Sequence, residues 1–404
     1  MKTKLPAAIM SCALLTAVDP AFAQEWTLRL SGYLPDAAAS SADGSKLVLT
    51  ELLYGSIYTS TDSGATWTTN NLPANDWGSV ASSANGMNLA AAPWEGWLYT
   101  STNAGATWTA NDLPSNSWTS VAMSADGSKL VALNQSGWVY TSTNSGASWT
   151  SNGIPVDTAQ WFFVNSSADG TRLVVAGDLG PICFSTNSGL TWTLATNVPV
   201  APWQAVAASA DGTKLVLVGL TNLIFTSSDS GITWKSNGVV GVDYWSGVAS
   251  SVDGSKLLAL AQTGPRYLFN SATPIYSSTD SGETWTQIAN PTTGMYRSIV
   301  SSADGAKLVL VGGGWYYGSI VTVGVGSVFT SYSIPSPRLS LTPSNANLLS
   351  SWLVPSTNFV LQQSLDLSSW TDVTNVPMLN LTNLQEEVAL TPTNSSGFFR
   401  LISK

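Results

Sequence analysis

Short apolar runs alternate with polar turns along most of this 404-residue chain, and the turns recur at a nearly constant spacing. Seven turns of the form Ser-x-Asp-Gly-x-x-Leu, with Asn for Asp in the second, separate apolar runs and begin at Ser41, Ser83, Ser124, Ser167, Ser209, Ser251 and Ser302. Asp-Gly between apolar runs is a strong hairpin signal, because both residues tolerate the positive φ of a type I′ turn. Each copy therefore predicts two antiparallel strands, with the neighbouring basic residues as solvated hairpin ends.

An octapeptide of the form S-[ST]-[DN]-[AS]-G-x-[ST]-W is interleaved with these turns. Its six copies begin at Ser60, Ser101, Ser142, Ser185, Ser227 and Ser278. The tryptophans that end the first five copies are 41, 41, 43 and 42 residues apart. A repeat of about 40–45 residues is typical of a four-stranded propeller blade.

The ends of the repeat region predict how the ring of blades closes. Trp26 lies 41 residues before Trp67 but has no octapeptide turn, whereas Val328–Ser331 resembles a third strand with no octapeptide after it. We therefore expect the N-terminal strand to complete the last blade. The predicted fold class is all-β, with a seven-bladed β-propeller over residues 24–334. Closure of the ring protects sheet edges that would otherwise pair with other chains.

Two further segments flank the predicted propeller. Residues 1–23 have the pattern of a secretory signal peptide, with two lysines, an apolar stretch and Ala21-Phe-Ala23 before Gln24. This predicts a bacterial protein that is secreted, periplasmic or on the cell surface. Residues 336–404 lack the repeat and carry short alternating segments, which predict a small immunoglobulin- or fibronectin-like β-sandwich. This segment resembles a C-terminal module found on secreted proteins of environmental bacteria.

Charge and cysteine content exclude several kinds of partner and chemistry. Removal of residues 1–23 takes away two lysines and one aspartate, which moves the net charge from −9 to −10. An acidic chain without a basic cluster disfavours nucleic acid as a partner. No later apolar run is long enough for a membrane span, and we expect a monomer. Cys183 lies in a predicted strand, which favours a buried residue over a nucleophile.

The octapeptides resemble Asp-box repeats, also called bacterial neuraminidase repeats, of the sialidase-like superfamily. Members include sialidases, xyloglucan-active glycosidases, sortilin-type receptors and photosystem II assembly factors, so the resemblance over about residues 24–334 implies a fold and no single activity. We expect the partners of the photosystem II assembly factors to need basic patches. This chain lacks such patches, which weakens that assignment. The third residue of each box is predicted to be a structural hydrogen-bond acceptor: Asp62, Asn103, Asn144, Asn187, Asp229 and Asp280. Loss of charge in half of the copies argues against catalysis or calcium binding there.

Both repeated turns are expected on one face of the propeller, so variable loops occupy the opposite face. We call it the loop face; it consists of the loops that join the second strand to the third and the fourth strand to the next blade. A recurring aromatic near the start of the inner strands either packs between blades or lines a sugar-stacking basin, and its regularity favours packing: Trp77, Trp118, Trp161, Trp203, Trp245 and Tyr296. Asp36 or Ala37 is expected at this place in the seventh blade.

Residues that break this regularity are the predicted ligand-binding residues, unless they are buried within blades. They are Trp94, Trp97, Trp138, Arg266, Tyr267, Trp315, Tyr316 and Tyr317. A large exposed aromatic patch on a globular protein typically marks a binding surface.

Enzymatic alternatives are limited by the residues present. The resemblance to sialidases would imply three arginines around a substrate carboxylate, but only Arg266 and Arg297 are expected on the loop face. The chain has no histidine, which excludes Ser-His hydrolases and His-ligated zinc. A two-carboxylate glycosidase stays open, with these candidates: Glu51, Asp76, Glu95, Asp157, Asp178 and Asp243. No cofactor or metal is predicted; loop carboxylates could hold calcium, although no D-x-D-x-D-G loop is present.

The sequence therefore favours a non-catalytic recognition or scaffold propeller that binds a glycan or an extracellular protein through its loop face. The alternative is a polysaccharide-active glycoside hydrolase that uses two carboxylates on the same face.

Overall fold

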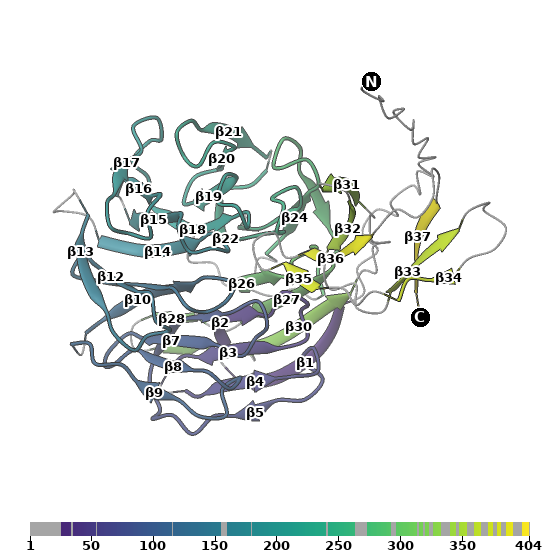
Figure 1. Ribbon diagram of the computed structural model, residues 1–404. Helices are drawn as coiled ribbons and strands as arrows, with labels where there is room; N and C mark the ends of the chain where they lie inside the picture. The colour runs from purple at the N-terminus through teal and green to yellow at the C-terminus, as the bar shows by residue number, and fades with distance from the viewer. Residues whose placement is uncertain are drawn as a thin grey trace. The chain divides into compact units, whose positions relative to one another are not determined.

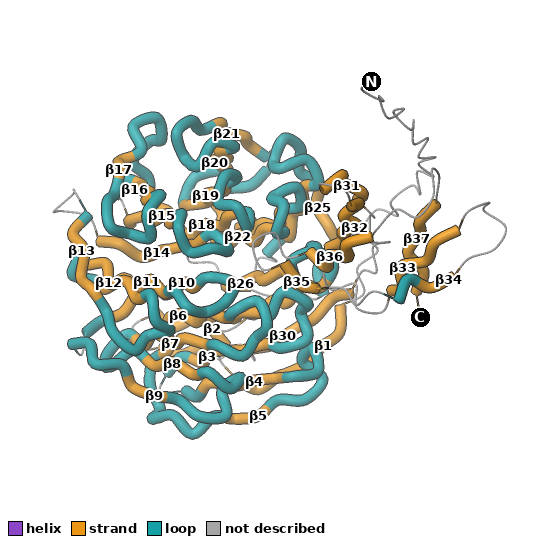
Figure 2. Tube along the Cα trace, viewed as in Figure 1, coloured by secondary structure: helices purple, strands orange, loops and turns teal. Residues whose placement is uncertain are grey.

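The structure is a computed structural model, and it describes residues 26–390 and 398–403 with internal gaps. The gaps are residues 34, 54, 115, 155–159, 179, 240, 263–272, 292–295, 313–314, 318–319, 323–325, 333–339, 345–346, 354–358, 365–370, 375–377 and 381–384. The chain forms two compact units, one of residues 23–333 with 381–384 and one of the remaining residues. Figure 2 shows strands and loops throughout the described part, where no helix is long and apolar enough to cross a membrane.

The first unit is a propeller of seven four-stranded antiparallel sheets, which we call blades 1 to 7 (Figure 1). Blade 1 is β2 Pro35–Ser40, β3 Leu47–Glu51, β4 Ile57–Ser60 and β5 Thr68–Thr69. Blade 2 is β6 Trp77–Ser82, β7 Leu89–Pro93, β8 Tyr99–Ser101 and β9 Thr109–Ala110. Blade 3 is β10 Trp118–Met123, β11 Leu130–Asn134, β12 Trp138–Ser142 and β13 Thr150–Gly153. Blade 4 is β14 Gln160–Ser166, β15 Leu173–Asp178, β16 Ile182–Ser185 and β17 Thr193–Leu194.

The remaining three blades follow the same order. Blade 5 is β18 Trp203–Ala208, β19 Leu215–Gly219, β20 Leu223–Ser227 and β21 Lys235–Gly238. Blade 6 is β22 Tyr244–Ser250, β23 Leu257–Gln262, β24 Ile275–Ser278 and β25 Thr286–Ile288. Blade 7 is β26 Tyr296–Ser301, β27 Lys307–Gly312, β30 Gly326–Tyr332 and β1 Trp26–Tyr33, and a small hairpin of β28 Trp315–Tyr317 and β29 Ile320–Thr322 lies between β27 and β30 in the chain.

The N-terminal strand closes the ring, as the sequence predicts. β1 pairs with β30, with Trp26 opposite Ser331, and so supplies the outer strand of blade 7. The predicted all-β fold and the seven-bladed propeller are therefore confirmed.

The Asp-Gly hairpins differ from the predicted type I′ turns. Gly44 has a φ of +66°, whereas Asp43 keeps an ordinary negative φ, and the Gly44 amide donates to the Ser41 carbonyl oxygen. The Asp43 side chain accepts hydrogen bonds from the Ser41 hydroxyl and the Ser45 amide, which holds the aspartate outside the left-handed region. The turn thus uses the aspartate as an acceptor rather than as a residue with positive φ.

A closed circuit of backbone hydrogen bonds joins the seven hairpin turns. In each turn the amide of the residue after the first serine donates to the equivalent carbonyl oxygen in the next blade, over 2.6–2.8 Å. The circuit runs through Ala42, Ala84, Ala125, Ala168, Ala210, Val252, Ala303 and back to Ala42. Because every donor is also an acceptor, loss of one blade would leave two of these groups unpaired.

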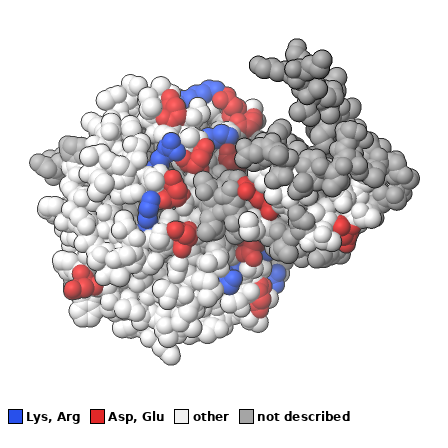
Figure 3. All heavy atoms as spheres, in the orientation of Figure 1, with Lys and Arg blue, Asp and Glu red and all other residues white. Residues whose placement is uncertain are grey.

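A second circuit, made by side chains, involves the residue just before the leucine of each hairpin turn. The sequence predicts a solvated hairpin end at this place. In six of the seven turns this side chain crosses to the next blade and donates to the carbonyl oxygen of its Asp or Asn over 2.6–3.1 Å, so a hairpin end that is partly exposed also joins two blades. The donors are Lys46, Asn88, Lys129, Arg172, Lys214 and Lys256. Lys307 completes the series over Gly44, where burial lowers its pKa and the Asp43 carboxylate opposes that shift. On the face in Figure 3, basic and acidic atoms are interspersed.

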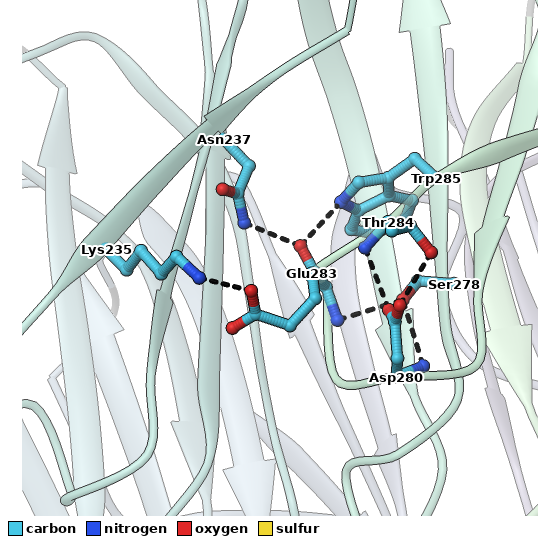
Figure 4. Close-up of polar contacts among 8 residues, drawn as sticks. Lys235, Asn237, Ser278, Asp280, Glu283, Thr284 and Trp285 are labelled. Carbon is cyan, nitrogen blue, oxygen red and sulfur yellow. Dashed lines mark hydrogen bonds and ion pairs between the residues drawn. The ribbon is translucent and has the colours of Figure 1, made fainter.

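The octapeptide is locked to the hairpin turn of its own blade. In blade 6, Ser281 adopts a φ of +61° and its amide donates to the Ser255 carbonyl oxygen. Asp280 accepts from the amide and the hydroxyl of Thr284 at 2.9 and 2.6 Å (Figure 4). Asn103, Asn144 and Asn187 accept the equivalent amide bond through Oδ1. The third residue of all six copies thus accepts this backbone hydrogen bond, Asp62 and Asp229 included.

An asparagine three residues after the octapeptide tryptophan extends this lock to the next blade. Asn237 of β21 donates to the Gly282 carbonyl oxygen of blade 6, which also accepts the Trp285 indole N–H (Figure 4). Asn111 instead accepts the Trp149 indole N–H at 3.0 Å. The W-x-x-N pattern was available in the sequence but was not recognised. The Lys235–Glu283 ion pair beside Asn237 is exposed and adds little.

The apolar core consists of separate clusters between neighbouring blades. One cluster joins Val139 of blade 3 to Trp161 and Cys183 of blade 4. Cys183 is fully buried, and burial raises the pKa of its thiol to about 12, so the predicted apolar role is confirmed. Since each cluster draws on two blades, no blade has a complete core by itself.

The second unit contains two small antiparallel sheets. One has the order β31 Ser340–Ser344, β32 Asn347–Leu353, β36 Gln385–Leu390 and β35 Met378–Asn380. The other has the order β34 Thr371–Asp372, β33 Phe359–Ser364 and β37 Phe398–Ser403. Leu361 packs in one apolar cluster with Val388 and Leu390, which lie in the other sheet. An immunoglobulin- or fibronectin-like topology stays a prediction.

Substitution of Asn88 by lysine should stabilise the propeller. Asn88 is the short member of the side-chain circuit, and a lysine there would reach the Asp126 carbonyl oxygen as Lys129 reaches Asp169. We expect Asn88→Lys to raise the free energy of unfolding by about 0.5–1 kcal/mol, measured by urea denaturation. Asn88→Ala is the control and should lower it. An unchanged midpoint for both variants would show that the circuit adds no stability.

Acid should weaken the octapeptide turns that carry Asp. Hydrogen bonds from Thr66 and Thr284 lower the pKa of Asp62 and Asp280 to about 2. A carboxylate with a lowered folded-state pKa stabilises above its unfolded pKa of about 4, and this contribution is lost as pH falls toward 2. The urea midpoint should therefore fall over this interval, and it should fall less in Asp62→Asn/Asp229→Asn/Asp280→Asn. Parallel pH profiles would contradict this account.

Candidate binding face

The recurring aromatics at the start of the inner strands are packing residues. Trp77, Trp118, Trp161, Trp203 and Trp245 are fully buried, and Tyr296 is 3% exposed. Most stand edge-on to an aromatic of the third strand, as Trp118 does to Tyr140 at 5.3 Å between ring centroids. The sugar-stacking basin is therefore excluded for this series. In blade 1 the equivalent place belongs to Pro35, not Asp36 or Ala37, because Pro35 pairs with Glu51 as Trp77 pairs with Pro93.

The loop face of blades 1 to 3 is organised by two asparagines that precede buried tryptophans. Asn75 forms a β-bridge with Gly55 of blade 1, and its amide nitrogen donates to the Glu95 carbonyl oxygen at 2.8 Å. Asn116 forms the same bridge with Gly96. The indole N–H groups of Trp77 and Trp118 donate to the carbonyl oxygens of Gly55 and Gly96 at 3.1 and 3.0 Å. The loops of one blade are thus fastened to the next.

Neither asparagine was predicted from the sequence. Asn75-Asp-Trp77 and Asn116-Ser-Trp118 are 41 residues apart, so an N-x-W signal was present in the repeat. It was missed because the tryptophans alone were compared.

The predicted ligand-binding tryptophans differ in exposure. Trp97 is 52% exposed and Trp138 is 50% exposed, so both offer ring surface to a partner. Trp94 is half-buried, and its indole packs so closely on Gly78 that a Cβ there would lie 2.7 Å from Nε1. Trp97 and Trp138 therefore fit a binding role better than Trp94. Trp315, Tyr316 and Tyr317 form β28, while Arg266 and Tyr267 lie outside the described residues.

Three of the six candidate acidic residues contact Asn75 or its bridge partner Gly55, two of them through their backbones. The Asp76 amide donates to Asn75 Oδ1, Glu95 accepts from the Asn75 amide through its carbonyl, and the Glu51 side chain packs against Gly55, which bridges to Asn75. Glu51 also accepts hydrogen bonds from the Tyr58 hydroxyl at 2.9 Å and the Ser56 amide at 3.4 Å. These contacts hold Glu51 within the turn of its own blade.

Asp178 and Asp243 belong to other blades and do not join this group. Asp243 is exposed in blade 6, where its amide donates to the Gln262 carbonyl oxygen. Asp178 ends β15 in blade 4, and Asp157 lies outside the described residues.

Arg297 is paired across the seam between the last blade and the first. Its guanidinium contacts the Asp36 carboxylate at 2.6 Å, with both side chains about four-fifths buried. Burial raises the pKa of Asp36, and the charge of Arg297 opposes that shift. A sialidase-like carboxylate clamp would need three arginines, and this ion pair occupies Arg297, one of the two expected on the loop face, which further weakens the sialidase hypothesis.

Comparisons with known proteins support the fold. The structure is similar to YCF48 bound to D1 peptide, with a TM-score of 0.57 and 14% identity over 79% of this chain and 97% of that chain. It is similar to the Cps50 (Swd1) β-propeller domain of Myceliophteria thermophila, with a TM-score of 0.58 and 11% identity over 76% and 99%. A third neighbour is the GH74 enzyme of Niastella koreensis, with a TM-score of 0.54 and 19% identity over 75% of this chain and 43% of that chain.

These similarities define the protein as a seven-bladed β-propeller and go no further. No protein-family model matches the chain, and no curated protein matches it. At 11–19% identity these neighbours share only the fold with this chain. They include both a protein bound to a peptide and an enzyme, so the fold does not define a function. Function must therefore be argued from this chain's own residues.

The seam ion pair should be strongly coupled in a double-mutant cycle. Removal of one buried partner leaves the other charge uncompensated, so we expect Asp36→Asn and Arg297→Gln each to cost about 3 kcal/mol of unfolding free energy. The double variant should cost clearly less than the sum, as measured by urea denaturation. Additive costs would show that the two charges do not act as a pair.

Proposed function

We propose that this protein is a secreted, non-catalytic recognition propeller that binds a glycan or another extracellular macromolecule through its loop face. The observation that best supports this proposal is the exposure of Trp97 and Trp138, each about half exposed, whereas the tryptophans of the inner strands are all buried. Exposed aromatics held by rigid loops are typical of binding surfaces. Secretion rests on the signal-like residues 1–23, which lie outside the described residues.

The surroundings of the two tryptophans support a ligand without strong negative charge. Between Lys46 and Lys129 the chain carries acidic residues but no basic residue. Both lysines are engaged in the side-chain circuit between hairpin turns. An anionic partner would therefore meet no compensating charge from this part of the chain.

A glycoside hydrolase is the second candidate, because Glu51, Asp76 and Glu95 gather around Asn75. A two-carboxylate mechanism needs one group free to act as acid or base and the other as nucleophile or base. The hydrogen bonds from Tyr58 and Ser56 give Glu51 a role within its own turn. That role favours recognition over catalysis for this group of carboxylates.

One panel experiment separates the two functions. The purified protein is incubated with neutral and anionic polysaccharides and with extracellular protein fractions, and both binding and release of reducing ends are scored. We expect binding without product. Glu51→Gln and Asp76→Asn should each retain that binding, and Glu95→Gln is scored for product release alone. Product release that one of these three substitutions abolishes would establish the hydrolase instead.

A further inference from the structure

Trp97 and Trp138 occupy the same structural position in neighbouring blades. Each follows a glycine with positive φ, Gly96 at +116° and Gly137 at +90°, and each precedes a fully buried apolar residue, Leu98 or Val139. Leu89 pairs with Ser101 in blade 2 as Leu130 pairs with Ser142 in blade 3, so each tryptophan lies four residues before the equivalent serine. The two tryptophans are therefore one feature repeated by the rotation between blades 2 and 3.

The repeated position is aromatic in these two blades alone among the seven. The residues there in the other blades are Ser56, Pro181, Leu223, Pro274 and Ser327. A role in propeller packing would call for an aromatic in every blade, as the inner-strand series has. The restriction to two adjacent blades points to a ligand.

The Trp138 ring stands clear of the outer strand of its own sheet. Trp138 is paired with Gly153 of β13, and a Cβ at Gly153 would meet no atom within 4 Å. In blade 5 the equivalent Leu223 does lean on its partner, since a Cβ at Gly238 would lie 3.4 Å from the Leu223 side chain. Trp138 is therefore available as an open platform.

Strand alternation sets the direction of both platforms. Side chains two apart share one side of a strand, so Trp138 of β12 lies on the side of Tyr140. Trp97 precedes β8 at the equivalent repeat position, and we infer that it lies on the side of Tyr99. Tyr140 packs on Trp118 in the cluster between blades 2 and 3, and Tyr99 packs in the cluster between blades 1 and 2. Both tryptophans thus face the preceding blade, and successive platforms have the same orientation.

We propose that Trp97 and Trp138 are two successive stacking subsites for one neutral polysaccharide chain that crosses blades 2 and 3. A polymer of pyranose rings presents the same apolar ring face at regular intervals, which matches platforms repeated in one orientation. The acidic residues Glu95 and Asp112, both exposed, supply acceptors for sugar hydroxyls and disfavour anionic chains. A cation-binding cage would need several rings around one point, whereas these rings belong to separate blades.

This inference rests on the proposed recognition function and narrows it. Two linked subsites on one chain give avidity, so affinity must depend on ligand length. A short oligosaccharide reaches one platform, whereas a longer one reaches both.

The experiment measures affinity against chain length. Calorimetry on the full-length protein uses neutral soluble polysaccharides (β-glucan, xyloglucan, galactomannan) and then two- to eight-unit oligomers of the one that binds. We expect the longest oligomer to bind at least about 10-fold more tightly than the shortest. Trp97→Ala or Trp138→Ala should remove most of this length dependence. Trp97→Phe, which keeps a planar ring, should preserve it.

Two control variants keep the test specific. Leu223→Ala alters the equivalent position in blade 5, and Ile232→Ala removes an exposed apolar residue of an octapeptide turn. Both should bind as the unchanged protein does, and thermal unfolding verifies that every variant is folded.

The possible failures are distinguishable. Polysaccharide binding that neither tryptophan variant affects would overturn the two-subsite inference and leave the recognition function standing. Binding only of an anionic polymer such as dextran sulfate, or only of polylysine, would overturn the neutral-chain assignment. Binding of an extracellular protein and of no polysaccharide would overturn this inference while supporting the broader proposal, and silence towards every partner would overturn both.

Discussion

Closure of the ring is the constraint on which the rest of the structure depends. The circuit of backbone hydrogen bonds from Ala42 through Ala303 and back to Ala42 has no free end, so each blade is held on both sides. The apolar clusters follow the same logic, because each draws on two neighbouring blades. A propeller of this kind gains its core only when the circle is complete.

The seam between the first and last blades shows how closure is enforced. β1 joins β30 by main-chain pairing, and the Asp36–Arg297 ion pair joins the inner strands of blades 1 and 7. Burial of these charges costs free energy, which the pairing offsets in part. Burial accordingly raises the pKa of Asp36, and the charge of Arg297 opposes that shift. A strand that paired in another register at the seam would separate the two charges and leave each of them uncompensated.

The two faces of the propeller have different physical roles. Two circuits of hydrogen bonds join the hairpin turns of neighbouring blades, and each octapeptide is locked to the hairpin turn of its own blade, so this face holds the blades together. On the loop face, Asn75 and Asn116 fasten the loops of blades 1 and 2 to the next blade and leave Trp97 and Trp138 exposed. Rigid support beneath an exposed aromatic lowers the entropic cost of ordering it on binding.

The sequence by itself determined the elements that repeat. Blade number, closure by the N-terminal strand and the acceptor role of Asp280 follow from spacing and turn chemistry, which are local properties. Tertiary structure decided what depends on a neighbouring blade. Lys46 appears as a solvated hairpin end until the next blade brings the Asn85 carbonyl within 3.0 Å. Residue type alone does not show that Trp77 is buried in the core and Trp97 is exposed, because burial depends on which blade packs beside each ring. The grouping of Glu51, Asp76 and Glu95 around Asn75 likewise arises from loops of two blades, and no spacing within one repeat encodes it.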